Sequence, residues 1–132
     1  MFGKKKQPTI KSLIAQGTQI TGDLRFNEGL RIDGEINGDV SSDPGAHSLL
    51  VVSETAHIVG AITANHIIIN GKVDGPVKAT ELLELQPKAQ IAGDVQYKAL
   101  EMHQGAVITG QLQPMGPEPE EKPVLKLAAS NG

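Results

Sequence analysis

The sequence has no cysteine, no tryptophan and only three aromatic residues among its 132 residues. The absence of cysteine excludes disulfides, thiolate metal sites and cysteine nucleophiles, and it is compatible with a reducing compartment. No apolar run approaches the roughly 18 residues of a membrane-spanning helix, and the N-terminus lacks the apolar core of a signal peptide. These absences predict a cytoplasmic protein, and the length predicts a single domain.

Phosphate-binding motifs are missing as well, both the P-loop and the glycine-rich dinucleotide fingerprint. Basic side chains are scarce in the body of the chain: residues 12–113 carry six Lys and Arg against twelve Asp and Glu, whereas residues 1–11 carry four Lys and no acid. Nucleic-acid binding needs clustered basic groups and stacking aromatics, so we expect no nucleic-acid partner for the body. No cofactor is expected, and any assembly should not require nucleotide.

A five-residue phrase recurs through the chain: an aliphatic residue, any residue, glycine, any residue, an aliphatic residue. The six copies are Ile20–Leu24, Ile36–Val40, Ile58–Ile62, Val73–Val77, Ile91–Val95 and Ile108–Leu112. Neighbouring glycines of the phrase are separated by 16, 22, 15, 18 and 17 residues. A fixed period of this length is typical of a repeat architecture.

Each repeat reads as one circuit of a three-sided coil. The two aliphatic residues of a phrase lie four apart and point to one side of an extended chain. The glycine between them indicates a corner, and three short strands with three corners use about 17–18 residues. Twelve isoleucines and nine valines suit a core of stacked aliphatic side chains. The sequence therefore predicts an all-β fold, a single three-sided β-solenoid of about six coils.

Two other folds are compatible with parts of this pattern. A β-sandwich also has regularly spaced short strands, but its strands do not normally repeat one glycine six times. The left-handed hexapeptide helix of acyltransferases has a coil of similar length, and Ile14, Ile20, Phe26 and Ile32 recur at steps of six. Position 38 is glycine, however, and the six-residue step is not sustained beyond it.

The repeats divide the chain into three parts. Residues 1–11 are predicted to form a basic flexible leader, residues 12–113 the β-helix domain, and residues 114–132 a proline-rich disordered tail. The spacing of 22 indicates an insertion at 43–47, extruded at a corner. Val124–Leu127 is the one apolar cluster in the tail, and it is either a docking segment or incidental.

Candidate catalytic and metal residues are few. His57, His66 and His103 fall in different coils, and stacking could gather them into a zinc site like that of β-helical carbonic anhydrases. Each adjoins an inward-facing aliphatic residue, so all three are predicted to face outward, and no metal or catalytic residue is assigned. Asp23, Asp39 and Asp94 follow phrase glycines, and solvated turn aspartates are favoured over a calcium ladder because the calcium-binding nonapeptide is missing.

The two ends of such a rod expose unpaired strand edges and the apolar cross-section of the core. Neither flank contains an amphipathic helix long enough to cover them, and uncapped rods satisfy their edges by meeting end to end. We therefore predict a self-assembling polymer. The predicted polymer-interface residues are Leu13, Ile14, Ile20, Val107, Ile108 and Leu112.

The leader is a candidate membrane contact. Phe2 could insert at the interface of an anionic bilayer, and each nearby lysine contributes about 1 kcal/mol of attraction. The predicted membrane-contact residues are Met1, Phe2, Lys4, Lys5 and Lys6. A single copy binds weakly, whereas many copies along a polymer bind strongly through effective concentration. The alternative is a solvated leader whose lysines only aid solubility.

Taken together, the Met-Phe leader with its lysines, the glycine-centred repeats and the proline-rich tail closely resemble the bactofilins. The resemblance covers the whole chain and is most specific over Leu30–Val40. It implies a right-handed triangular β-helix and bacterial cytoskeletal filaments that assemble end to end without nucleotide. It also implies attachment to the inner face of the cytoplasmic membrane and a scaffolding role for cell-shape or cell-envelope proteins as cargo.

Two rival functions remain at this point. An enzyme, either a hexapeptide-type acyltransferase or a zinc lyase, would form discrete trimers and depend on its histidines. A monomeric binding module would use its acidic face or its tail to bind a partner, and it would stay monomeric at high concentration.

Overall fold

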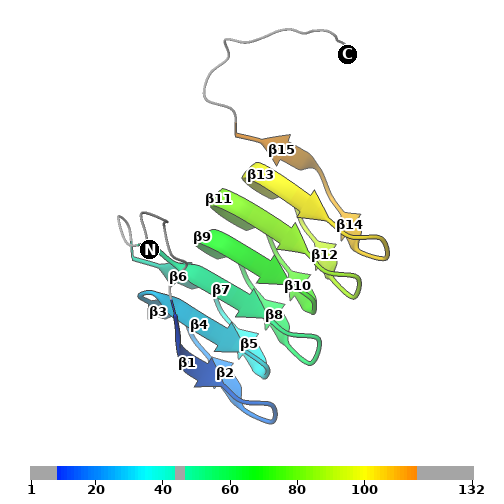
Figure 1. Cartoon of the computed structure of the whole chain (residues 1–132). Helices are drawn as coiled ribbons and strands as arrows, with labels where there is room; N and C mark the ends of the chain where they lie inside the picture. Colours follow the sequence, from blue (N-terminus) through cyan, green and yellow to red (C-terminus); the bar gives the residue numbers. More distant parts are fainter. Residues whose placement is uncertain (1–8, 44–46, 116–132) are drawn as a thin grey trace, which may run out of the picture.

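The computed structural model describes residues 9–43 and 47–115, and every regular element in this part of the chain is a β-strand. The strands are β1 (Ile10–Ile14), β2 (Gln19–Thr21), β3 (Leu24–Phe26), β4 (Gly29–Ile32), β5 (Glu35–Asn37), β6 (Val40–Ser42), β7 (Leu49–Val52), β8 (His57–Val59), β9 (Ile62–Ile69), β10 (Lys72–Asp74), β11 (Val77–Leu85), β12 (Gln90–Ala92), β13 (Val95–Met102), β14 (Val107–Thr109) and β15 (Leu112–Pro114). They stack in chain order from β1 at one end to β15 at the other (Figure 1).

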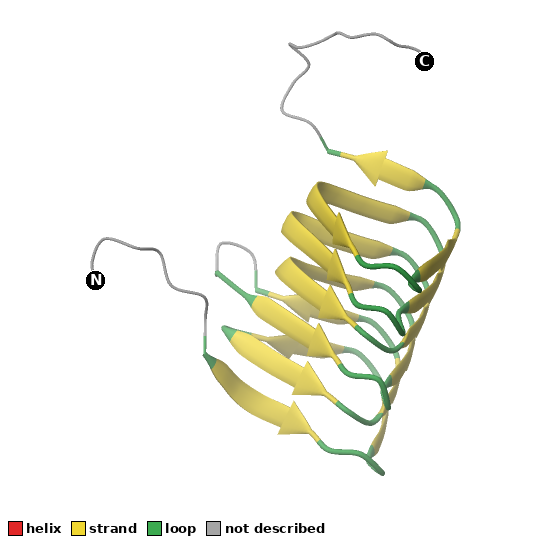
Figure 2. Ribbon diagram, turned by 45° about the vertical axis from the view of Figure 1, so that its right-hand side comes forward, coloured by secondary structure: helices red, strands yellow, loops and turns green. Residues whose placement is uncertain are grey.

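The strands form three faces around a common axis, and all of their pairings are parallel. The first face is a separate six-stranded sheet in the order β14-β12-β10-β8-β5-β2. The second face contains β3, β6, the first halves of β9, β11 and β13, and β15. The third contains β1, β4, β7 and the second halves of β9, β11 and β13. This arrangement confirms the predicted β-solenoid of about six coils (Figure 2).

The corner between the second and third faces changes along the stack. In the first two coils it separates distinct strands, whereas β9, β11 and β13 run through it with a shift of register. The loop between β6 and β7 lies at this corner, as predicted for the insertion, although residues 44–46 fall outside the described residues.

The core is a column of aliphatic side chains contributed by the repeated phrase. Ile36, Ile58, Val73 and Ile91 are consecutive partners in the first face, and each is at most 2 % exposed. Full burial of one such side chain contributes about 1.5–3 kcal/mol. The repeat therefore stabilises the fold by stacking equivalent side chains on one another.

The central glycine of the phrase is required by the close approach of successive corners. Gly38 has a φ of +154°, and a Cβ atom at this position would lie 2.1 Å from the carbonyl oxygen of Gly22 in the coil below. Gly60 stands in the same relation to Gly38, also at 2.1 Å. Any side chain here would collide with backbone, which confirms the interpretation of the glycines as corners.

Candidate polymerisation interfaces at the ends of the solenoid

The C-terminal end of the solenoid exposes side chains whose equivalents are buried in the coil below. Leu112 pairs in register with Val95 and points inward as Val95 does, but Leu112 is 46 % exposed whereas Val95 is fully buried. Met102 stands in the same relation to Leu85, again at 46 % against 0 %. Ile108 is half-buried above Ile91. The last coil therefore presents an apolar cross-section to solvent.

The N-terminal end of the solenoid also exposes side chains whose equivalents in the next coil are buried. Ile14 pairs with Ile32, and Ile20 pairs with Ile36. The two partners in the second coil are fully buried or nearly so, while Ile14 and Ile20 are only half-buried. Both ends of the described solenoid thus expose part of the core.

The remaining two predicted interface residues lie on the outer surface of the terminal coils. Leu13 pairs with the exposed Arg31, and Val107 pairs with the exposed Gln90. The side chains of Leu13 and Val107 are 58 % and 53 % exposed. They lie beside the apolar cross-sections rather than within them, and their part in an interface stays a prediction.

Aspartates that follow the corner glycines connect successive coils. The Asp23 carboxylate accepts a hydrogen bond from the backbone N–H of Asp39 at 3.0 Å, and the Asp39 carboxylate accepts one from Ala61 at 2.9 Å. Asp94 accepts from the N–H of Gln111 at 3.0 Å. These carboxylates are therefore acceptors for the coil above, a structural role that the sequence pattern alone did not reveal.

One of these hydrogen bonds between successive coils is missing at Ala61, and the residue in the next coil does not need it. Ala61 has no carboxylate to offer, and the register of Ile62 with Val77 places Pro76 above it. Proline has no N–H to donate. The coil without the acceptor is thus followed by the coil without the donor.

The three candidate histidines are not gathered into one site. His57 Nε2 lies 2.8 Å from Asp74 Oδ2 on the first face. His66 is 8 % exposed, so the prediction that it faces outward is wrong: it lies where β9 turns the corner between two faces, and burial lowers its pKa. Within the described ranges, no cluster of potential metal ligands contains more than one of the three.

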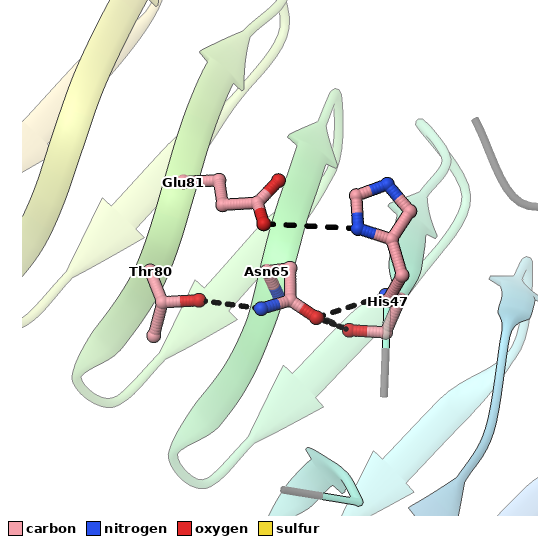
Figure 3. Close-up of polar contacts among 5 residues, drawn as sticks. His47, Asn65, Thr80 and Glu81 are labelled. Carbon is pink, nitrogen blue, oxygen red and sulfur yellow. Dashed lines mark hydrogen bonds and ion pairs between the residues drawn. The ribbon is translucent and has the colours of Figure 1, made fainter. Parts of the chain in front are cut away.

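A polar network fixes the end of the loop that precedes β7. Asn65 Oδ1 accepts hydrogen bonds from the backbone N–H and the hydroxyl of Ser48, each at 2.9 Å. Asn65 Nδ2 donates to Thr80 Oγ1 at 2.8 Å, and His47 Nδ1 lies 3.7 Å from Glu81 Oε2 (Figure 3). The network spans three successive coils, so it ties this loop to β9 and β11.

The predicted membrane-contact residues Met1, Phe2, Lys4, Lys5 and Lys6 lie outside the described residues, as do 124–127 and almost all of the predicted tail. In the part of the chain that is described, no helix is long and apolar enough to cross a bilayer.

Known proteins resemble this chain over most of its length. A family model described as "Bactofilin: Polymer-forming cytoskeletal" matches residues 12–113. Bactofilin BacP of Myxococcus xanthus (strain DK1622) is 23 % identical over 117 residues, which cover 89 % of this chain and 47 % of that protein. The chain therefore spans about half the length of this relative. No solved structure gives a significant match.

Proposed function

The chain belongs to the bactofilin family of polymer-forming cytoskeletal proteins, and we propose that it assembles end to end, without nucleotide, into membrane-associated filaments. The observation that carries this proposal is the exposure of core side chains at the ends of the solenoid, above all Leu112 at 46 %. Its equivalent one coil below is fully buried. A further coil supplied by another copy would restore that burial.

The energetics favour such a contact. Full burial of a large aliphatic side chain contributes about 1.5–3 kcal/mol, so covering the exposed halves of Leu112 and Met102 contributes about 2 kcal/mol together. The open strand edges at each end add backbone hydrogen bonds between copies. Because stacking leaves a free end on each new copy, the assembly grows into a filament rather than closing into a ring.

The leader supplies the proposed membrane contact. Met1 and Phe2 would insert at the interface while Lys4, Lys5 and Lys6 face anionic headgroups at the inner face of the cytoplasmic membrane. One leader contributes only about 3–5 kcal/mol, whereas a filament presents many leaders to one surface. The polymer would then scaffold cell-shape or cell-envelope proteins at that membrane.

Deleting residues 1–6 separates assembly from membrane binding. We expect the truncated protein to form filaments but to lose co-sedimentation with vesicles containing anionic phosphatidylglycerol. The matched control replaces Lys4, Lys5 and Lys6 with glutamine, which removes the charge and keeps Phe2, and its binding should be intermediate. Unchanged binding of the deletion variant would contradict the leader assignment, and loss of filaments would contradict the separation of the two roles.

A further inference from the structure

Three potential metal ligands converge on the outer surface of the third face, close to the C-terminal end. Glu84 in β11 pairs in register with Glu101 in β13, and His103 follows β13. The ligand atoms of these three residues all lie within 4.8 Å of one another, and His103 Nε2 is 3.8 Å from Glu84 Oε2. Among the described residues, no other cluster of three such groups is this close.

The register explains why the two carboxylates are close. Strands in one sheet lie about 4.8 Å apart, so residues that pair across two coils place their side chains next to each other. Two like charges directly opposite one another are destabilising. In the coil below, the same position holds the uncharged Ile68. A cation between Glu84 and Glu101 would replace their repulsion with two attractive contacts.

Two of the three ligands are already oriented. The Gln86 side-chain amide donates a hydrogen bond to Glu84 Oε2, and the Glu84 side chain is only 21 % exposed. The backbone N–H of His103 donates to the carbonyl oxygen of Leu85 at 2.9 Å, which fixes the turn that carries the imidazole. Hydrogen bonds that hold a ligating carboxylate in place are a usual feature of metal sites.

The ligand set indicates the class of metal. One imidazole nitrogen and two carboxylate oxygens suit zinc and neighbouring divalent transition metals better than calcium or magnesium, which take oxygen ligands. Ligand atoms about 2.0–2.2 Å from one zinc ion stand ~3–3.5 Å apart, and rotation of the exposed Glu101 and His103 side chains closes the present gap. Three protein ligands leave a position for water.

We propose that Glu84, Glu101 and His103 bind a divalent transition-metal ion that links the last two coils of the solenoid. The site does not depend on filament formation, because all three ligands come from one copy of the chain. Bound metal would bridge β11 and β13, and since it binds only the folded site it would raise the stability of the folded protein.

Equilibrium dialysis of the full-length protein against Zn²⁺, with the metal quantified on both sides, tests the site and works with or without filaments. We expect one saturable site per chain. Loss of a group that only orients a metal ligand already weakens metal binding about 10–100-fold. His103→Asn and Glu84→Gln each remove a proposed ligand itself, so each should weaken Zn²⁺ binding at least tenfold. The matched control is His57→Asn, because among the described residues the His57–Asp74 pair has no third potential ligand within reach.

Circular dichroism of each variant without metal establishes that it is folded, and thermal unfolding gives a second measurement. Zn²⁺ should raise the midpoint of the wild type and of His57→Asn but not that of His103→Asn. The proposal is overturned if no saturable site is found, or if His57→Asn and His103→Asn lose binding equally.

Discussion

Replacing Leu112 with aspartate tests the end-to-end joint at the residue where the core is most clearly exposed. Leu112 points into the interior of the last coil and is 46 % exposed. In the isolated chain the new carboxylate would reach solvent through this open end, so the solenoid should still fold. In a filament the same carboxylate would be buried between two apolar cross-sections.

The expected effect on assembly is large. The joint would lose the half-burial of one leucine, about 1 kcal/mol. It would also gain an unpaired buried charge, which costs about 3 kcal/mol. Because each 1.4 kcal/mol is a factor of ten in an equilibrium constant, a loss of about 4 kcal/mol raises the critical concentration for assembly roughly 1,000-fold.

Val59→Asp is the matched control. Val59 lies in β8 near the middle of the stack and is 42 % exposed, so it offers similar apolar exposure on the side of the rod rather than at its end. Sedimentation over a concentration series measures the critical concentration, and circular dichroism establishes that each variant is folded. Filaments of Leu112→Asp at an unchanged critical concentration would refute the joint.

Three further predictions concern the solenoid itself. Gly60→Ala would place a Cβ atom 2.1 Å from a backbone oxygen and should reduce the free energy of unfolding by at least about 2 kcal/mol. Gly17→Ala, at φ +93° with nothing within 4 Å, should cost only about 1–2 kcal/mol. Urea unfolding compares the two variants, and equal losses would contradict the claim that close approach of successive corners requires Gly60. Asp39→Ala leaves the N–H of Ala61 without its acceptor and should cost about 1 kcal/mol in the same assay, so an unchanged stability would show that the bond is dispensable. Burial, partly offset by Glu84, lowers the pKa of His66 below its ordinary 6.5. Well above pH 6.5 the imidazole is neutral in both the folded and the unfolded state and has no effect on stability, whereas as the pH falls through 6.5 the unfolded state takes up the proton first and stability falls. His66→Gln should flatten this decline between pH 7 and 5, and an identical slope in wild type and variant would contradict the lowered pKa of His66.

Most of the fold could be predicted from one repeated phrase. The six glycine-centred copies predicted the corners and the coil length, and the aliphatic residues around them predicted the core. The period worked because stacking imposes the same local geometry on every coil. The longer spacing around 43–47 also predicted the position of the loop between β6 and β7, since an insertion can leave a solenoid only at a corner.

The candidate sites were harder to predict because they depend on register and on side-chain direction. The repeated phrase correctly placed Ile108 on the core side of the last coil, but its neighbour Val107, which was also predicted at the interface, points outward. His66 was expected outside and is buried, because the corner reverses the alternation of the strand it belongs to. The sequence contained one sign of the proposed metal-ligand cluster: Glu84 and Glu101 are 17 residues apart, which is the length of one coil.

Negative-stain electron microscopy of the purified full-length protein, in buffer free of metal and nucleotide, tests the central claim most directly. The exposed ends predict long, thin filaments under these conditions. Compact particles of uniform size at high protein concentration would contradict end-to-end assembly.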